Sequence, residues 1–426
     1  MASIRLPYGA GTVEIPVRDE DLAWVAVPGR ADTGGMGADE LVRRSLEYPI
    51  GTKRLRYLAG PGKNVAIVVD DVTRPTPVHK ILPHVMRELE AAGTKPRDIK
   101  VVIALGTHRV MTHEEIRTKC GPLDHAIEMV NASYEDAKEF VSIGEGLLGE
   151  SIDVLRKVAE ADLIIGIGNI VPHFYAGWGG GAKIIQPGIC DERTTEATHI
   201  LGVLNDSILN LCTNPENLVR REMEHIAGKV GLDFIVNTVL DEHKQIVGVF
   251  SGHYVKAHRA GVALAEKVYR PLVPCLADIV VVTANPSHID YWQGIKGLVH
   301  AQYGLRQGGV CVFAMSAGEG LAGGNEKHTS TIMQWAVKCA DEIKEGIRQK
   351  KSEDLIAMAF CLSHRQMLDR ARAVSVTSGI DGDVMAKLGF IPASDMESAM
   401  KKAQEIAGEH AKVGVVTYAG IAVRPE

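Results

Sequence analysis

The sequence has no long apolar segment and no excess of basic charge. No stretch of eighteen or more consecutive apolar residues occurs in the chain, so a membrane-spanning helix is not expected. The formal net charge of −6 argues against a surface for nucleic acid or anionic lipid, because such a surface needs clustered lysine and arginine. Residues 1–7 lack the apolar core of a secretory signal. These absences predict a cytoplasmic protein whose partners include neither nucleic acid nor a membrane.

The cysteines are few and follow no metal-binding spacing. Seven are scattered between Cys120 and Cys361, without any C-x-x-C pair. An odd number of dispersed cysteines argues against a disulfide framework and against a cysteine-ligated zinc site, and it favours a reducing compartment. The hydrophobic fraction of 46% and the charged fraction of 23% are ordinary for a globular protein.

The length of the chain predicts two domains. At 426 residues it is too long for one hydrophobic core. Residues 270–274 contain two prolines and interrupt the apolar pattern, which is typical of a linker. We therefore expect an N-terminal domain over residues 1–270 and a C-terminal domain over residues 271–426.

Strand, loop and helix alternate through both expected domains. Thr76 is the predicted N-cap of one helix, and Thr112 with Glu115 forms a predicted capping box. This alternation predicts an α/β fold with mainly parallel sheets. The predicted strands cover 64–69, 99–104, 163–168, 233–240, 245–249, 277–284, 309–314, 373–377 and 413–418, with a hairpin at 4–16; the predicted helices cover 39–47, 78–92, 191–212, 215–228, 255–269 and 332–349.

Polar side chains follow the predicted strands at the points where those strands end. Asp71 and Arg74 follow the strand at 64–69, and His108 follows the strand at 99–104. His173 and Lys183 follow the next strand in the same way. Because the carboxyl ends of parallel strands meet at one edge of a sheet, we expect these side chains to converge. A cleft between the two domains is the predicted active site.

A glycine-rich loop leads into Lys183. It contains Gly177 and the glycines at 179–181. Glycine lets the backbone approach a ligand, and a lysine after such a loop either holds a phosphate or carries a covalent adduct. Ile184 stands where a P-loop needs serine or threonine, and Val171 stands where a dinucleotide fingerprint needs its third glycine. A tight bend with a solvated lysine remains the alternative to a lysine directed at a ligand.

Three histidines are candidates for catalysis or metal binding. His108 and His173 lie on neighbouring loops and can supply a base and an acid near neutral pH. His199 lies in the predicted helix at 191–212 and is a candidate metal ligand. The three together would suit a zinc site, but H-E-x-x-H is absent and zinc does not explain Lys183. Each histidine alone is equally compatible with a structural role.

Further polar residues are candidates for substrate binding. Arg74 is suited to a bidentate contact with a carboxylate. Gln293 and Lys296 are three residues apart and share one face if that segment is helical. The alternatives are a surface ion pair for Arg74 and a solvated helix face for Gln293 and Lys296. Polar residues at 287–288 and 325–328 could recognise a second carboxylate or additional hydroxyls.

Together these motifs resemble those of the nickel-dependent lactate racemase family. The family has two domains with the site in the cleft between them, and its members hold a nickel pincer nucleotide, a pyridinium mononucleotide whose two sulfur-containing arms grip nickel. The motifs follow in the family's order over most of the chain. They are Asp70-Asp-Val-Thr-Arg-Pro-Thr-Pro77, Gly106-Thr-His108, His173 through Gly-Gly-Gly-Ala-Lys183, His199, and Gln293-x-x-Lys296.

The resemblance implies a role for each candidate residue. Lys183 would be linked covalently to the cofactor, and His199 would be the protein ligand to nickel. His108 and His173 would be the two acid/base residues, so the domain at 1–270 would carry the cofactor and the domain at 271–426 would close over the substrate. The other implied cofactor-binding residues are Asp71, Gly179, Gly180 and Gly181; the implied substrate-binding residues are Arg74, Gln293 and Lys296.

The resemblance also implies the reaction, which is racemisation or epimerisation of a 2-hydroxy acid, lactate or a larger relative. The C2 hydrogen is very weakly acidic, so it would leave as hydride while a base takes the hydroxyl proton, giving a 2-keto acid. Each enantiomer presents its hydroxyl to a different side, which requires two bases. Maturation would need cofactor-synthesis proteins.

The sequence leaves open how large the substrate is, and it is compatible with two other functions. Trp292 before Gln293 departs from the single tyrosine expected there, so the sequence does not fix the pocket size. One alternative function is a non-catalytic protein that binds a nucleotide cofactor. The other is a zinc hydrolase that uses the three histidines.

Overall fold

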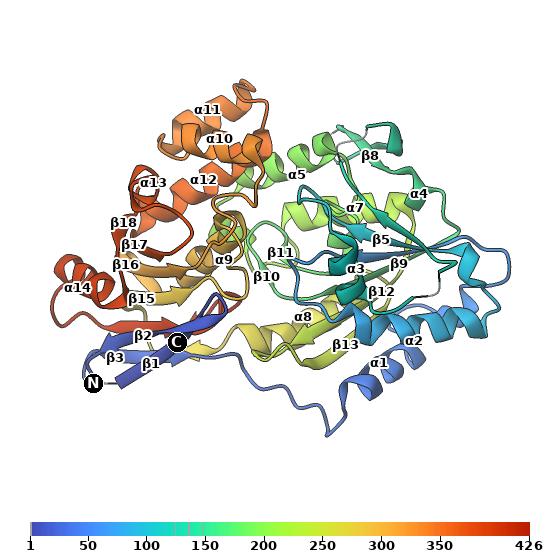
Figure 1. The fold of residues 1–426 in the computed structure, drawn as a ribbon, viewed down its shortest axis with the longest axis horizontal. Helices are drawn as coiled ribbons and strands as arrows, with labels where there is room; N and C mark the ends of the chain where they lie inside the picture. The colour runs from blue at the N-terminus through green and yellow to red at the C-terminus, as the bar shows by residue number, and fades with distance from the viewer. Residues whose placement is uncertain (1, 124, 135–136, 148) are drawn as a thin grey trace.

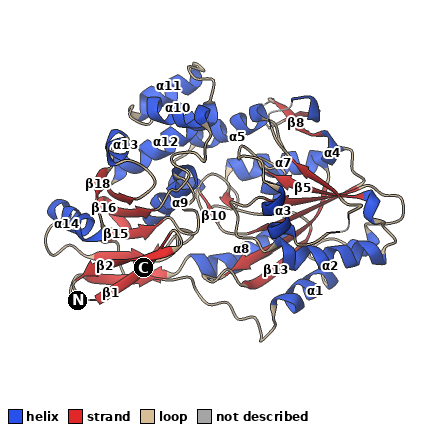
Figure 2. Cartoon of the chain, viewed as in Figure 1, coloured by secondary structure: helices blue, strands red, loops and turns tan. Residues whose placement is uncertain are grey.

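The protein forms two α/β lobes that lie side by side (Figure 1). The computed structural model describes residues 2–123, 125–134, 137–147 and 149–426. Each lobe is built on a six-stranded sheet with helices on both faces (Figure 2). The first sheet has the order β13-β12-β9-β4-β5-β6 and the second β18-β17-β16-β15-β19-β3. All pairs in these sheets are parallel except β12 with β13, which confirms the predicted fold class.

The elements have the following bounds. The strands are β1 (Ala2–Tyr8), β2 (Gly11–Val17), β3 (Leu22–Ala26), β4 (Val65–Asp70), β5 (Ile99–Ala104), β6 (Glu128–Asn131), β7 (Phe140–Glu145), β8 (Ser151–Leu155), β9 (Leu163–Asn169), β10 (Pro172–His173), β11 (Gly177–Trp178), β12 (Leu232–Leu240), β13 (Ile246–Gly252), β14 (Leu272–Val273), β15 (Ala277–Thr283), β16 (Leu305–Met315), β17 (Arg372–Thr377), β18 (Ile391–Ala393), β19 (Val413–Val416) and β20 (Arg424–Pro425). The α-helices are α1 (Ala38–Glu47), α2 (Val78–Ala91), α3 (His113–Cys120), α4 (Arg156–Ala159), α5 (Glu192–Asn205), α6 (Ile208–Leu211), α7 (Leu218–Val230), α8 (Lys256–Tyr269), α9 (Tyr291–Ala301), α10 (Glu326–Trp335), α11 (Ala340–Arg348), α12 (Leu355–Arg370), α13 (Gly382–Lys387) and α14 (Met396–Ala407). Short 3-10 helices are η1 (Leu55–Tyr57), η2 (Pro96–Asp98), η3 (Ala137–Glu139) and η4 (Gly181–Ile184). Within the described ranges, no helix combines the length and the apolar character that crossing a membrane requires.

The central strands are apolar throughout because both faces of each sheet are covered. In β9, Ile165 and Ile167 pack with α1, α2 and α3, whereas Ile164 packs into the core on the opposite face. In β15, Val281 faces α14 and the β1–β2 hairpin, whereas Val280 faces α9 and α12. Successive side chains of a strand point to opposite faces, so strands covered on both faces read as continuous apolar runs.

The two lobes share buried contacts. One hydrophobic core contains residues of both lobes. Tyr175 of the first lobe lies with its hydroxyl 2.8 Å from the Ser363 hydroxyl of α12, and Tyr303 of the second lobe donates to the carbonyl of Leu209 at 2.6 Å. Residues on the two sides of the cleft are therefore held close together.

The first residues of the chain lie with the second lobe rather than the first. Strand β3 pairs in parallel with β19, and the β1–β2 hairpin packs its Leu6 and Ile15 against the second sheet. The N-terminus accordingly lies beside the C-terminal strands (Figure 1). Residues 2–26 therefore pack with the second lobe, although the sequence predicts that they belong to the N-terminal domain, because pairing with a strand nearly the whole chain away leaves no local signal. The boundary at residues 270–271 stays a prediction.

Three helix predictions are wrong in detail. The expected helix at 191–212 is two helices, α5 and α6, which are separated at Asp206 and Ser207. The expected helix at 332–349 is two helices, α10 and α11, and the second begins where the Glu342 side chain accepts from the Cys339 backbone N–H at 3.3 Å. Thr76 does not cap α2; its hydroxyl instead donates to the Asp70 carboxylate. The capping box from Thr112 to Glu115 is present.

Candidate active site

A cavity between the lobes gathers almost all the predicted site residues. Loops at the carboxyl ends of β4, β5 and β9 form one wall, and α9 with the loop after β15 forms the opposite wall. This is where ligands bind in α/β folds. The predicted residues that line the cavity are Asp71, Arg74, His108, His173, Gly179, Gly180, Lys183, His199, Gln293 and Lys296.

His108 is oriented by a buried carboxylate. Its Nδ1–H donates to Asp71 Oδ2 at 2.7 Å, and the Thr73 hydroxyl donates to Asp71 Oδ1 at 2.7 Å. The proton on Nδ1 leaves Nε2 as an acceptor, and Gln293 Nε2–H donates to it at 2.9 Å. Burial lowers the pKa of His108, against the opposing effect of Asp71. His108 is therefore neutral, and the lone pair on its Nε2 is directed at Gln293 of the second lobe.

Asp71 remains ionised in this pair. Burial alone would raise the pKa of its carboxyl, but His108, Arg74 and the Thr73 hydroxyl together hold the pKa well below its usual range. A carboxylate bonded to Nδ1–H fixes the tautomer of a histidine and stabilises its protonated form. Asp71 therefore fixes the tautomer of His108, whereas the resemblance had implied that Asp71 contacts the cofactor.

His173 has a different environment. Its Nδ1 accepts backbone N–H groups of Tyr175 and Ala176, each at 3.2 Å, so the neutral ring carries its proton on Nε2. Its ring stacks on that of Phe174 with centroids 5.0 Å apart. Burial and the positive charge of Lys183 lower the pKa of His173 well below its ordinary value. The two histidines therefore face the cavity with opposite tautomers.

The cavity is rich in cations. Arg74 Nη1 donates to the Gln293 side-chain oxygen at 3.1 Å, and the Lys296 ammonium donates to the same oxygen. Burial, followed by the charge of Arg74, lowers the pKa of Lys296. Burial and the charges of Arg74 and Arg220 lower the pKa of Lys183 to about 7. Such a site favours anionic ligands, and it keeps a large fraction of the Lys183 amine in the neutral, nucleophilic form.

The depressed pKa gives a direct prediction for the cofactor-free protein. The rate at which an amine-directed acylating reagent modifies Lys183 should rise to half its maximum near pH 7, because the neutral amine is the reactive form. The exposed Lys229 of α7 serves as the control lysine. Peptide mass spectrometry after timed labelling measures both. A Lys183 profile that matches the Lys229 profile would contradict the electrostatic description of the site.

His199 is arranged as a metal ligand would be. It lies on α5, and its Nδ1–H donates to the carbonyl of Thr195 at 2.7 Å. This bond leaves Nε2 with the lone pair, which is the usual way in which a second hydrogen bond orients a metal-binding histidine. The edge of its ring contacts Tyr175 with centroids 5.0 Å apart. Burial lowers the pKa of His199 to about 4, so it is neutral and able to coordinate.

A buried arginine shapes the glycine-rich loop. Arg220 of α7 donates from Nε to the carbonyl of Ala176 and from Nη1 to the carbonyl of Gly180, both at 3.1 Å, and from Nη2 to the carbonyl of Trp178. Its side chain is completely buried. The guanidinium holds three carbonyls of the loop that connects His173 to Lys183.

Two of the loop glycines are required by packing inside the protein. A Cβ at Gly180 would lie 2.6 Å from the Asn237 side-chain oxygen, and one at Gly181 would lie 2.9 Å from the ring of His258. Both have positive φ, 72° and 59°, which other residues rarely adopt. Gly181 does not line the cavity, so the structure gives no support to its implied contact with the cofactor.

Removing the Arg220 side chain should destabilise the protein. The variant Arg220→Met removes three charge-assisted hydrogen bonds to carbonyls of the loop, which we expect to cost about 3–5 kcal/mol. For domains of this size the loss corresponds to a fall in Tm of roughly 5–15 °C. Calorimetry measures it, with Arg221→Met as the matched control, because Arg221 is the exposed neighbour on the same helix. Equal Tm values for the two variants would show that Arg220 does not hold the loop.

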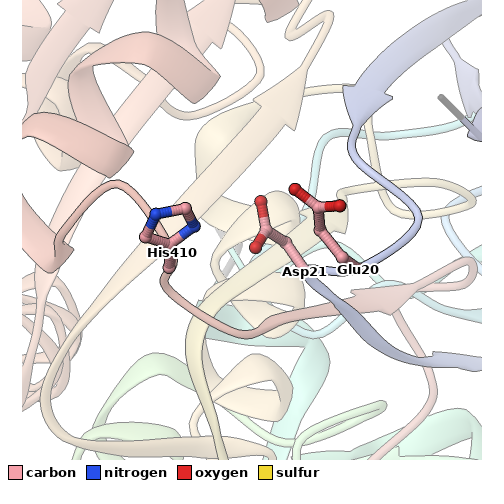
Figure 3. A group of neighbouring side chains, drawn as sticks. All are labelled: Glu20, Asp21 and His410. Carbon is pink, nitrogen blue, oxygen red and sulfur yellow. The ribbon is translucent and has the colours of Figure 1, made fainter.

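One group of potential metal ligands lies outside the cavity. Glu20, Asp21 and His410 place ligand atoms within 4.8 Å of one another (Figure 3). However, Arg18 donates to Asp21 at 2.6 Å, and its Nη2 lies 3.3 Å from His410 Nδ1. We interpret the group as an ion-pair cluster that joins the turn before β3 to the loop before β19.

The three cavity histidines do not form a zinc site. No other group of three ligand side chains converges within 4.8 Å in the described parts of the chain. This geometry contradicts the zinc hydrolase alternative.

Comparison with known proteins decides the family. The sequence profile of the lactate racemase N-terminal domain matches residues 8–211, and that of the lactate racemase C-terminal domain matches residues 273–424. The chain belongs to the lactate racemase family. Family membership confirms the predicted resemblance and the predicted enzyme class, because racemases are isomerases.

Full-length relatives share this organisation. The lactate racemase of Lactiplantibacillus plantarum is 31% identical over 422 residues, which cover 98% of each chain. The lactate racemase of Thermoanaerobacterium thermosaccharolyticum is 28% identical over 427 residues, covering 98% of this chain and 97% of that one. The solved structure of the apoprotein from the latter organism superposes with a TM-score of 0.88 over 99% of this chain and 100% of that one, at 28% identity. A Thermotoga maritima protein, 18% identical, shares the fold with a TM-score of 0.70 over 94% of this chain and 100% of that one.

Several site residues were not predicted from the sequence. Thr73 completes the support of Asp71, and Arg220, Asn237 and His258 hold the glycine-rich loop. Arg220 stands beside an exposed arginine in a charged helix, so nothing in its local sequence indicates burial. Thr73 carried a signal, since it lies between the two predicted site residues of the same loop.

Proposed function

We propose that the chain racemises or epimerises a 2-hydroxy acid by hydride transfer, with a nickel pincer nucleotide linked covalently to Lys183. The proposal rests on one observation above all: a single cationic cavity is lined by four groups suited to this chemistry. They are His108 with its carboxylate partner, His173, Lys183 with its lowered pKa, and His199 with a lone pair on Nε2. Membership in the lactate racemase family supports the same activity.

The residues of the cavity fit this cofactor. His199 would provide the protein ligand to nickel through Nε2, and the Lys183 amine would form the thioamide link. The His300 ring also lines the cavity, and its buried Nε2 has no hydrogen-bond partner among the described residues, so a polar ligand group is expected beside it. When bound, the cofactor supplies a hydride acceptor, which no amino acid side chain provides.

The cations would hold the carboxylate of the substrate. Arg74 and Lys296 already converge on one oxygen, the side-chain oxygen of Gln293. A carboxylate oxygen in this position would satisfy both donors, and Arg74 is suited to bind it bidentately. Gln293 would then rotate, and its amide would be free to contact the hydroxyl of the substrate.

The two histidines would exchange the hydroxyl proton. His108 would accept it at Nε2, the atom that now accepts from Gln293, with Asp71 stabilising the resulting imidazolium. His173 would serve the mirror-image substrate from its own side of the cavity, after its ring proton moves from Nε2 to Nδ1 and the bonds from the Tyr175 and Ala176 N–H groups are released. Because the pKa of His108 is lowered, the base stays available at neutral pH, and its contribution is lost as pH falls through a value below 6.5. The substrate passes through a 2-keto acid.

Intact mass combined with metal analysis tests the proposal. Protein produced together with the cofactor-synthesis proteins should carry a covalent adduct on the peptide containing Lys183 and close to one nickel per chain. Protein produced without them should show neither. Zinc in place of nickel, or an adduct on another residue, would refute the proposed cofactor chemistry.

A further inference from the structure

A second cavity opens beside His108, on the side away from His173. It has a volume of about 490 Å³ and shares His108, Trp292 and Gln293 with the first cavity. The glycine-rich loop after β16 and the start of α10 form its outer wall. A substrate placed with its hydroxyl on His108 would direct its remaining carbons into this space, which is far larger than a methyl group requires.

Two carboxylate oxygens lie beside this glycine-rich loop, one from Glu319 of the loop itself and one from Asp290, the N-cap residue of α9. A Cβ built on Gly323 would lie 2.8 Å from Asp290 Oδ2 and 3.4 Å from Glu319 Oε2, so the two oxygens flank the bare backbone of that glycine. Asp290 Oδ1 accepts the Gln293 backbone N–H at 2.7 Å, but Oδ2 accepts no hydrogen bond within the described residues. Burial raises the pKa of Asp290 to about 6, so at neutral pH it is mostly an acceptor.

A third polar group lies in the same wall. His328 is buried, and its Nδ1–H donates to Asp354 at 2.6 Å. Its Nε2 is left without a hydrogen-bond partner among the described residues. A buried nitrogen of this kind is normally satisfied by a ligand or a water molecule.

The other groups of the cavity disfavour a second carboxylate or an aromatic tail. The cations are already paired. Arg109 lies 2.8 Å from Glu115 and 3.7 Å from Glu319 Oε1, which leaves Oε2 of Glu319 for a ligand, and Lys327 lies 2.6 Å from Glu192. Both faces of the Trp292 ring are covered, by His328 at 4.4 Å and by Phe360 at 4.7 Å between centroids. A tail with hydroxyl groups satisfies the acceptors that remain, since each hydroxyl donates one hydrogen bond.

We propose that this second cavity binds the hydroxylated tail of an aldonic-type 2-hydroxy acid, with Asp290 and Glu319 accepting hydrogen bonds from its hydroxyls. The inference rests on the proposed function and names its substrate class. It explains why the loop carries glycine at 323 and 324, where a side chain would enter the space between the lobes.

A substrate panel on the cofactor-loaded enzyme tests the inference. The probes are lactate, malate, 3-phenyllactate and gluconate, and chiral chromatography measures inversion at C2. We expect kcat/KM for gluconate to exceed that for lactate by at least about 100-fold, because polar groups built for hydroxyls are left unpaired by a shorter substrate. A higher kcat/KM for any of the other three acids would overturn the inference while leaving the proposed function intact. Failure of the loaded enzyme to invert any of the four would overturn both.

A variant separates tail recognition from catalysis. Glu319→Gln should raise KM for gluconate by about tenfold or more and leave kcat/KM for lactate within about twofold. The exposed Glu353→Gln is the matched control and should change neither value. Equal effects of Glu319→Gln on both substrates would contradict a role in binding the tail.

Discussion

Replacing His108 with alanine should lower kcat for racemisation by about 10²–10⁴-fold, the usual contribution of a positioned acid/base group. The physical reason is the pairing of Asp71 with His108, in which Asp71 Oδ2 lies 2.7 Å from Nδ1 of the ring. This bond keeps the ring proton on Nδ1 and leaves Nε2 to accept the hydroxyl proton of the substrate. Initial rates from each enantiomer measure the effect. Substrate binding should change much less, because Arg74 and Lys296 remain in place.

The control for this prediction is an exposed histidine in the helix that follows the His108 loop. His113 is exposed at the start of α3, and His113→Ala should leave the rates unchanged. Asp71→Asn should show an intermediate loss, because it removes the support of His108 but keeps the ring. Normal activity of His108→Ala in both directions would exclude His108 as a proton acceptor.

Replacing Lys183 with alanine should abolish racemisation and remove the covalent adduct. Among the described residues of the first lobe, no lysine besides Lys183 lines the cavity, so the thioamide would have no alternative anchor there. The variant should still fold, since its backbone lies in η4 and the loop is held by Arg220, Asn237 and His258. Intact mass spectrometry and the racemisation assay measure the two losses together.

Lys229→Ala provides the comparison for Lys183→Ala. Lys229 is exposed on α7, and its removal should change neither the adduct mass nor the activity. Retention of a nickel-containing adduct by Lys183→Ala would contradict the assignment of Lys183 as the anchor.

The convergence of the site was predictable from the sequence because its signals are local. Apolar runs marked the core strands, and Asp71, His108 and His173 each followed one of them directly. In parallel sheets the carboxyl ends lie at one edge, so the order of strands and loops was enough to place these side chains in one cavity. The separation of these residues in the sequence did not affect the prediction, because each strand is recognised from its own apolar run.

The parts that could not be predicted depend on distant contacts. Strand β3 pairs with β19, which lies close to the other end of the chain. Helix α12 was not predicted at all, because its residues from Leu355 to His364 are all buried, and a helix covered on all sides lacks the periodic polar face that identifies helices. Arg220 looks solvated in its charged helix and is buried only because three carbonyls of another segment surround it.

The tautomers of the two histidines also lie beyond sequence reasoning. Both residues were predicted as acid/base groups from the same kind of position, after a core strand. Their difference comes from neighbours that the strand pattern does not place: a carboxylate beside His108 and two backbone amides beside His173. Of the two histidines, only His108 is therefore oriented by a carboxylate.

Isotope retention at C2 tests the central claim most directly. The loaded enzyme would be given one enantiomer of a 2-hydroxy acid with deuterium at C2, in ordinary water, and the inverted product would be separated and its mass measured. If C2 loses hydride and regains it while the two histidines exchange only the hydroxyl proton, the inverted product keeps its deuterium. Inverted product carrying hydrogen from water at C2 would contradict the account.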